Sequence, residues 1–183
     1  MSEALNGESS RMVENKFVKN LAALGRIPEV GERPARARAI IINHEGTKFI
    51  GILRQRVDSD PYVVFPGGGL EDSDQTFLAG VEREVEEELT NVHPGSVSYV
   101  ENVLEFDNQF YLIGTIKNED INFVVGGPEK DRDPAQHGTF LPGWYLISDI
   151  PQLNVVPQEV SLKLTDAYNQ PQQLLSHLIQ LKE

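Results

Sequence analysis

Residues 65–88 combine a glycine-rich run with a carboxylate-rich segment, and both residue types suit phosphate chemistry. The run 66–69 reads Pro-Gly-Gly-Gly, which predicts a turn, and glycine lets a phosphate approach the backbone amides closely. Five glutamates follow between residues 82 and 88. Carboxylates crowded at neutral pH repel one another, and a hard divalent cation relieves that repulsion. The sequence therefore predicts a site for a phosphate compound bound together with magnesium.

A helix over the acidic segment gathers three of these five glutamates on one side. At about 100° per residue, Glu87 and Glu88 fall on either side of Glu84, within a fan of roughly 100°. Glu82 and Glu86 point away from this fan. A separate apolar stripe, which predicts the core-facing side, consists of Leu78, Val81, Val85 and Leu89.

Two readings of this helix remain open at this point. The first is an exposed acidic helix without a ligand, because like charges one turn apart destabilise a helix by only about 0.2–0.5 kcal/mol per pair. The preceding glycines and the embedded Arg83 favour a ligand site instead. Gly80 lies one turn before Glu84 on the same side, where a missing side chain is expected to leave room for a ligand.

The segment resembles the Nudix box, Gly-x5-Glu-x7-Arg-Glu-U-x-Glu-Glu-x-Gly-U, in which U is a bulky aliphatic residue. The positions that match in register are Gly69, Arg83, Glu84, Val85, Glu87 and Glu88. The resemblance implies a loop–helix–loop catalytic motif in which Glu84, Glu87 and Glu88 carry divalent metal. It also implies that Arg83 orients a metal-binding glutamate through charge-assisted hydrogen bonds.

The segment departs from the box at both ends. Gln75 stands where the box has its first acid, and Asp74 lies one place earlier. A one-residue insertion before the helix brings Asp74 near the expected place and aligns Glu71 with a frequent family position. Whether Asp74 or Gln75 takes the role stays open. Thr90 and Asn91 replace the closing Gly-U, and Asn91 is expected to supply a left-handed cap.

The reaction that the resemblance implies is hydrolysis of a nucleoside diphosphate joined to another moiety. Mg²⁺, with Mn²⁺ as a possible substitute, would be held by the three glutamates and by the backbone of Gly68. Gly67, Gly68 and Gly69 would cradle the diphosphate. Arg54 and Arg56 would contact phosphates or the base, and Phe140 would stack on the base.

The general base is left open between a box glutamate and a loop acid. Glu87 is the box candidate. Glu129 is preferred among loop acids, because Gly126-Gly127-Pro128 would hold it in a defined turn. The other loop candidates are Glu105, Asp131 and Asp133. The identity of the linked moiety, the number of metal ions and the oligomeric state also stay open.

Composition limits the partners and the compartment. The net charge of −12 argues against binding to duplex nucleic acid, which relies on many Lys and Arg contacts. Basic residues nevertheless gather ahead of the glycine run: Arg26, Arg33, Arg36, Arg38, Lys48, Arg54 and Arg56. The chain has no cysteine and no apolar run of the roughly 20 residues that cross a membrane, so a cytoplasmic protein is expected. A non-catalytic nucleotide-sensing module is the alternative to a hydrolase.

The chain divides into an N-terminal extension, residues 1–33, and a domain, residues 34–183. A short amphipathic helix near residues 13–24 makes a homodimer plausible. A polar loop is expected over 126–143. Strands are expected at 37–43, 48–57, 62–65, 97–104, 109–117 and 144–147, and helices at 157–168 and 171–181. Together with the resemblance, this order predicts the α/β class, as a Nudix-type α/β/α sandwich with a mixed β-sheet between helices.

Overall fold

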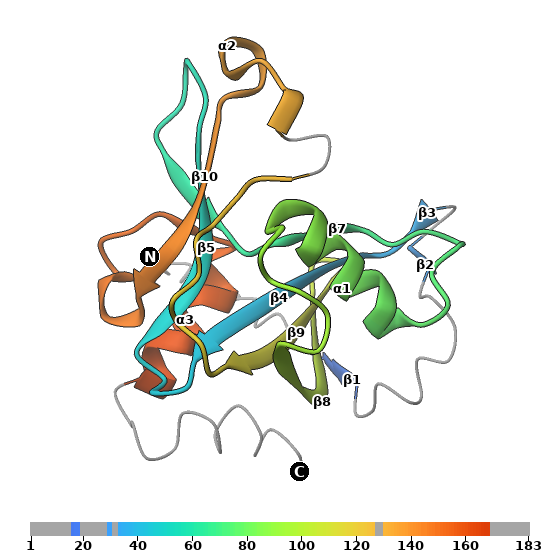
Figure 1. Cartoon of the computed structure of the whole chain (residues 1–183). Helices are drawn as coiled ribbons and strands as arrows, with labels where there is room; N and C mark the ends of the chain where they lie inside the picture. The colour runs from blue at the N-terminus through green and yellow to red at the C-terminus, as the bar shows by residue number, and fades with distance from the viewer. Residues whose placement is uncertain (1–15, 19–28, 31–32, 127–129, 169–183) are drawn as a thin grey trace, which may run out of the picture.

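The computed structural model describes residues 16–18, 29–30, 33–126 and 130–168 (Figure 1). Its strands are β1 (Lys16–Val18), β2 (Glu29–Val30), β3 (Arg33–Pro34), β4 (Arg36–Asn43), β5 (Lys48–Gln55), β6 (Tyr62–Val64), β7 (Gly67–Gly69), β8 (Val97–Phe106), β9 (Gln109–Ile116), β10 (Thr139–Leu146) and β11 (Val155–Val156). Its helices are α1 (Phe77–Glu88), α2 (Pro134–His137), the 3-10 helix η3 (Ile147–Asp149) and α3 (Gln158–Tyr168). Among these residues, no helix has the length and apolar character needed to traverse a bilayer.

The main sheet is mixed, as the sequence predicted. Its strand order over the described residues is β1-β8-β9-β4-β5-β6-β11, with β10 paired to β5 and β7 paired to β4. The β4–β9 and β6–β11 pairs are parallel. The remaining pairs of this sheet are antiparallel. β4 lies at the centre and connects the glycine strand β7 to the rest of the sheet.

Strand alternation on β4 separates the two faces of the sheet. Ala37, Ala39 and Ile41 pack in the core cluster that contains α1. Ile40 and Ile42 pack in a second cluster, which contains α3. Successive side chains of a strand point to opposite faces, so one apolar strand supports a helix on each side. The α/β/α arrangement predicted from the sequence is therefore confirmed (Figure 1).

Helix α1 begins and ends for local reasons. The Thr76 hydroxyl accepts a hydrogen bond from the Ala79 amide at 3.1 Å, which satisfies one of the free amides of the first turn. Phe77, Val81 and Val85 are buried beneath the helix. Burial of each such side chain contributes about 1.5–3 kcal/mol. The helix therefore presents one fixed face to the core and, beside it, Glu84 and Glu88 to the glycine strand.

The turn expected over the glycines is in fact a short strand. β7 pairs antiparallel with β4, placing Gly69 opposite Arg36 and Gly67 opposite Arg38. Gly67 has a φ of 137°, and a Cβ there would overlap the Ala37 carbonyl oxygen. The strand forms because the missing side chains let the two backbones approach closely.

Three other predictions need correction. Lys16–Val18 of the expected N-terminal helix form β1, which pairs with β8 and satisfies backbone groups on that strand's outer edge. The rest of that segment and residues 171–181 lie outside the described residues.

The expected loop 126–143 contains α2 and half of β10, where Pro142 is tolerated on a strand paired on one side. Asn91 does not have a positive φ, and the chain after α1 is held instead by the Thr90 amide, which donates to the Val124 carbonyl at 3.0 Å.

Candidate active site

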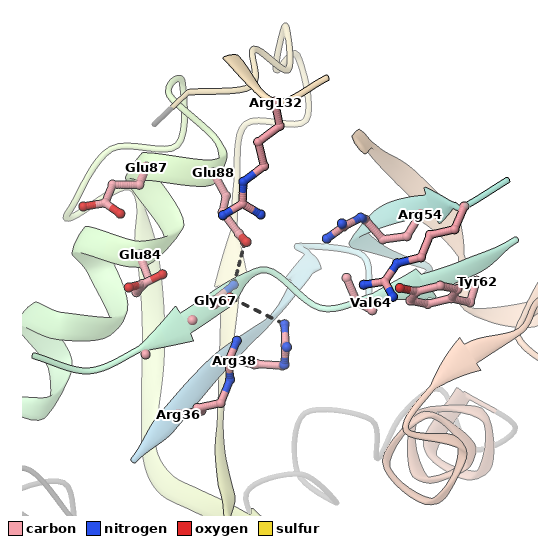
Figure 2. Close-up of a pocket in the computed structure, with 13 residues that line it drawn as sticks. Arg36, Arg38, Arg54, Tyr62, Val64, Gly67, Glu84, Glu87, Glu88 and Arg132 are labelled. Carbon is pink, nitrogen blue, oxygen red and sulfur yellow. Dashed lines mark hydrogen bonds between the residues drawn. The ribbon is translucent and has the colours of Figure 1, made fainter. Parts of the chain in front are cut away.

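A cavity of about 570 Å³ opens between α1, β7 and the neighbouring ends of β4, β5 and β6 (Figure 2). This volume lies within the range of ligand pockets in proteins. The fan predicted on α1 faces it, whereas Glu82 and Glu86 do not line it. The lining residues are Arg36, Arg38, Arg54, Arg56, Tyr62, Val64, Gly67, Gly68, Gly69, Glu84, Glu87, Glu88 and Arg132.

Arg83 lies behind the carboxylates and joins them to the preceding loop. Its Nε donates to Asp74 Oδ1 at 2.9 Å and its Nη2 donates to Asp74 Oδ2 at 3.0 Å. Its Nη1 donates to Glu84 at 2.9 Å and to Glu87 at 3.3 Å. Nη2 also donates to the Gly69 carbonyl at 3.2 Å. One guanidinium thus fixes two cavity glutamates relative to the glycine strand.

The structure assigns the Arg83 contact to Asp74 rather than to Gln75, as the insertion predicts. The Asp74 side chain is only 5% exposed, and Gln75 is exposed. Hydrogen bonding from Arg83 lowers the pKa of Asp74 below its ordinary range. Hydrogen bonding to Asp74 is also the largest cause that raises the pKa of Arg83. The pair is therefore ionised on both sides at neutral pH.

The missing side chain of Gly80 leaves room for the Asp74 carboxylate of this ion pair and not for a ligand. A Cβ on Gly80 would come within 2.6 Å of Asp74 Oδ2 and 2.7 Å of Leu70 Cδ2. The expectation that Gly80 leaves room for a ligand is therefore wrong. The space above the helix is filled by the carboxylate that anchors Arg83.

Glu84 is the most constrained of the three cavity carboxylates. Its side chain is 14% exposed, and burial raises its pKa although Arg83 opposes the shift. A Cβ on Gly68 would overlap the Glu84 carboxylate, with Cδ only 2.7 Å away. A glycine at 68 is therefore required for Glu84 to lie against the β7 backbone, as Figure 2 shows.

Glu88 contacts the glycine strand from the same helix. Its Oε2 accepts a hydrogen bond from the Gly67 amide at 2.7 Å. On the other side of the strand, Arg38 Nη1 donates to the Phe65 carbonyl at 2.8 Å and to the Gly67 carbonyl at 3.5 Å. Burial lowers the pKa of Arg38, whereas the Glu88 charge opposes that shift. The Gly67 backbone is thus held between the Glu88 carboxylate and the Arg38 guanidinium.

The predicted substrate-binding arginines line the cavity, but Phe140 does not. Arg54 packs over the Phe140 ring at 5.1 Å from the centroid, and its Nη2 donates to the His137 carbonyl at 3.4 Å. Phe140 therefore supports Arg54 from behind. Trp144 does not line the cavity either; it packs against Phe123 and donates to the Glu119 carbonyl.

From the sequence, Arg36 and Arg38 were grouped with the other basic residues but were not assigned to the site. Arg132 and Tyr62 were not named as candidates. The usable signal was spacing, since residues 36 and 38, like 54 and 56, lie two apart within or next to predicted strands, and residues two apart on a strand share a side. Tyr62 faces the cavity because its strand pairs with β5 opposite Arg54. No local pattern marks Arg132, which precedes α2.

Comparison with known proteins places the chain in a family. A family model described as the NUDIX domain matches residues 32–161, which is more than half of the chain. The chain belongs to the Nudix family. No curated protein matches it significantly.

Solved structures of Nudix proteins resemble it at low identity. The MutT Nudix hydrolase from Burkholderia pseudomallei is 19% identical, with a TM-score of 0.47, covering 70% of this chain and 95% of that one. A structure from work on MutT of Aliivibrio salmonicida and Vibrio cholerae is 18% identical, with a TM-score of 0.43 and coverages of 65% and 84%. An ADP compounds hydrolase is 13% identical, with a TM-score of 0.46 and coverages of 78% and 77%.

The donor set of this Nudix site fits a hard divalent cation, because carboxylate oxygens are the ligands that such ions prefer. Glu84, Glu87 and Glu88 supply those oxygens on one wall of the cavity. As the side chains lie, Arg83 holds two of them, and the described residues contain no group of three acids or histidines close enough to hold an ion. The donor chemistry is thus present in an arrangement centred on Arg83.

The loop acids considered as general bases lie apart from the cavity lining. Asp133 caps α2 by accepting from the Ala135 amide at 3.0 Å. Glu105 belongs to β8 and pairs with Phe110 in the sheet. Asp131 is exposed. None of these three lines the cavity, and Glu129 lies outside the described residues. Glu87, the box candidate, does line it.

Proposed function

We propose that this Nudix protein is a metal-dependent pyrophosphohydrolase that cleaves the diphosphate linkage of a nucleoside diphosphate derivative. The observation that carries the proposal is the single cavity in which three α1 carboxylates face the glycine strand and several arginines. Carboxylates and guanidiniums that line the same cavity suit an anionic substrate that arrives with a cation. Magnesium is the proposed ion, with manganese as a substitute.

The proposed roles follow from the contacts. Glu84, Glu87 and Glu88 would hold the ion, together with the backbone of Gly68. When bound, the ion lowers the pKa of a coordinated water and offsets charge on the leaving phosphate. Arg83 keeps two of the carboxylates in place.

The phosphate chain would lie along β7. Its glycines present backbone to the ligand without side-chain obstruction, and the arginines that line the cavity would neutralise the phosphate oxygens. In the reaction, the water oxygen bonds to one phosphorus as the bridging P–O bond breaks, and its electron pair stays with the leaving phosphate. The proton of the water passes to a carboxylate, for which Glu87 is the proposed base because it is the most exposed partner of Arg83.

The test uses a panel of diphosphate compounds with Mg²⁺ and measures released monophosphate or phosphate. Glu84→Gln and Glu88→Gln are expected to reduce turnover at least about 100-fold without loss of fold by circular dichroism. Glu82→Gln is the matched control, since Glu82 is on the same helix but faces away from the cavity. Wild-type rates in the first two variants would contradict the proposal. Binding without any turnover in the wild type would favour the alternative, a nucleotide-sensing module.

A further inference from the structure

Positive charge is concentrated in the cavity against the overall sign of the chain. Five of the nine arginines in the sequence line it, and no lysine does so within the described residues. Five guanidiniums face three carboxylates there, in a chain of net charge −12. Arginine is the residue that binds phosphate oxygens in a bidentate manner, whereas lysine acts as a point charge.

Most of these guanidiniums lack an acidic partner in the described part of the chain. Arg36, Arg38, Arg54 and Arg56 form no ion pair within 4.0 Å there. Arg38 bonds to two carbonyls and to Gln109 Oε1, all neutral acceptors. Arg54 likewise bonds to a carbonyl and packs on an aromatic ring. Arg38 and Arg54 are partly buried, and a partly desolvated cation without an ion-pair partner is costly, so an anionic ligand would stabilise the site.

The arginines extend beyond the place where the carboxylates meet the glycine strand. Arg36 and Arg38 pair in register with Gly69 and Gly67, directly beside the acids of α1. Arg54 comes from β5, and Figure 2 shows it with Tyr62 on the side of the cavity away from Glu84 and Glu87. Arg56 follows two residues later and also lines the cavity. The part of the cavity lined by arginines therefore extends farther than the part lined by the α1 glutamates.

A diphosphate esterified at both ends bears one charge on each phosphate, and under the proposed function both phosphates lie along β7, beside Arg36 and Arg38. Arg54 and Arg56 would then face no anion. We propose that the substrate carries at least one ionised phosphate beyond the diphosphate that is cut, and that Arg54 and Arg56 bind this additional phosphate. The inference rests on the proposed function for the place of cleavage. It narrows the substrate class to oligophosphates and to diphosphates with a separate phosphate group.

The first experiment compares substrates that differ only in phosphate. kcat/KM is measured with Mg²⁺ for NADP against NAD, and for a dinucleoside tetraphosphate against the dinucleoside diphosphate. The compound with more phosphate is expected to be preferred at least about tenfold in one of the pairs, since its additional phosphate gains charge-assisted hydrogen bonds from Arg54 and Arg56. The pair that shows the preference tells whether the extra phosphate lies within the chain or apart from it. Equal values in both pairs would overturn the proposal.

The second experiment measures binding without turnover, so it stays decisive if no compound is hydrolysed. Inorganic tripolyphosphate and pyrophosphate are titrated by calorimetry, in EDTA, into the wild type and Arg56→Gln. Arg56 is exposed, so the variant is expected to fold. Lys117→Gln is the control, because it removes the same charge from an exposed position that does not line the cavity.

The expected result is selective. Arg56→Gln should weaken tripolyphosphate binding about tenfold and leave pyrophosphate binding within about twofold, while Lys117→Gln changes neither. Equal weakening for both anions, or unchanged tripolyphosphate binding, would overturn the role of Arg56. An absence of hydrolysis in the wild type, by contrast, would refute only the proposed reaction.

Discussion

The substitution Asp74→Asn tests whether Asp74, which lies one place before the position of the first box acid, takes the role of that acid. The change keeps the size of the side chain and removes its charge. It also sets an amide N–H₂ against the Arg83 guanidinium, so that one of the two hydrogen bonds, 2.9 Å and 3.0 Å long, becomes donor against donor. Arg83 then retains Glu84, Glu87, the Gly69 carbonyl and one amide oxygen at position 74 as acceptors.

The expected loss of stability follows from burial. Exposed ion pairs contribute about 0–1 kcal/mol, and removal of one partner of a buried pair costs about 3–5 kcal/mol. Asp74 is 5% exposed and Arg83 is 26% exposed, so the pair lies between these limits. The free energy of unfolding should fall by about 2 kcal/mol, which lowers the Tm by roughly 4–8 °C for a chain of this size.

The pH dependence gives a second, independent measurement. The pKa of Asp74 is lowered in the folded state by the Arg83 hydrogen bonds. The contribution of the pair is therefore fully present above the ordinary pKa of 3.8 and is lost as pH falls through the lower folded value. The difference between wild type and Asp74→Asn should be constant from pH 7 to pH 5 and should shrink below about pH 4.

Activity should fall as well, because Arg83 positions two cavity carboxylates. Loss of a partner that orients such ligands costs about 10–100-fold in activity. Urea unfolding and initial rates on a hydrolysed diphosphate measure the two effects. The control is Gln75→Ala, since Gln75 is exposed and should be silent. The reasoning is refuted if Asp74→Asn matches the wild type in stability and rate, or if Gln75→Ala causes the same loss.

Three further outcomes are expected. Gly68→Ala should lower turnover at least about tenfold, because its Cβ displaces the Glu84 carboxylate; a wild-type rate in this variant would show that Glu84 need not lie against the strand. Phe140→Leu should raise KM about 2- to 5-fold with little change in kcat, through loss of about 0.5–1 kcal/mol of stacking on Arg54, and an unchanged KM would count against this support. Saturating Mg²⁺ at about 100 times its Kd should stabilise the fold by about 2.7 kcal/mol in a thermal melt; Glu84→Gln should lose this shift, and no shift in the wild type would contradict metal binding.

Local patterns predicted the elements that carry the site. The 3.6-residue period of the acidic segment placed Glu84, Glu87 and Glu88 on one side, and the structure has all three lining one cavity. The apolar stripe packs against the sheet as expected, with Val81 and Val85 buried. Helical phase depends on the chain alone, so it can be read without knowledge of distant contacts.

Contacts between segments far apart in sequence could not be predicted in the same way. The glycine run was expected to be a turn, yet it pairs with β4, about 30 residues earlier in the chain. Gly80 was expected to leave room for a ligand, yet Asp74 and Leu70 fill the space. In both cases glycine gives the backbone freedom to approach a neighbour, and only the fold decides which neighbour arrives.

The sequence by itself determined the Nudix box, the phase of its helix and the alternating strands, because each is a periodic or local property of the chain, and the resemblance to the Nudix family implied the α/β/α sandwich. The tertiary structure decided that Asp74 anchors Arg83, and that arginines from β4, β5 and the segment before α2 share one cavity with the glutamates. Side chains separated by up to about a hundred residues meet there through strand register and packing. No local pattern encodes those distances, because they depend on how every element of the sheet fits against the next.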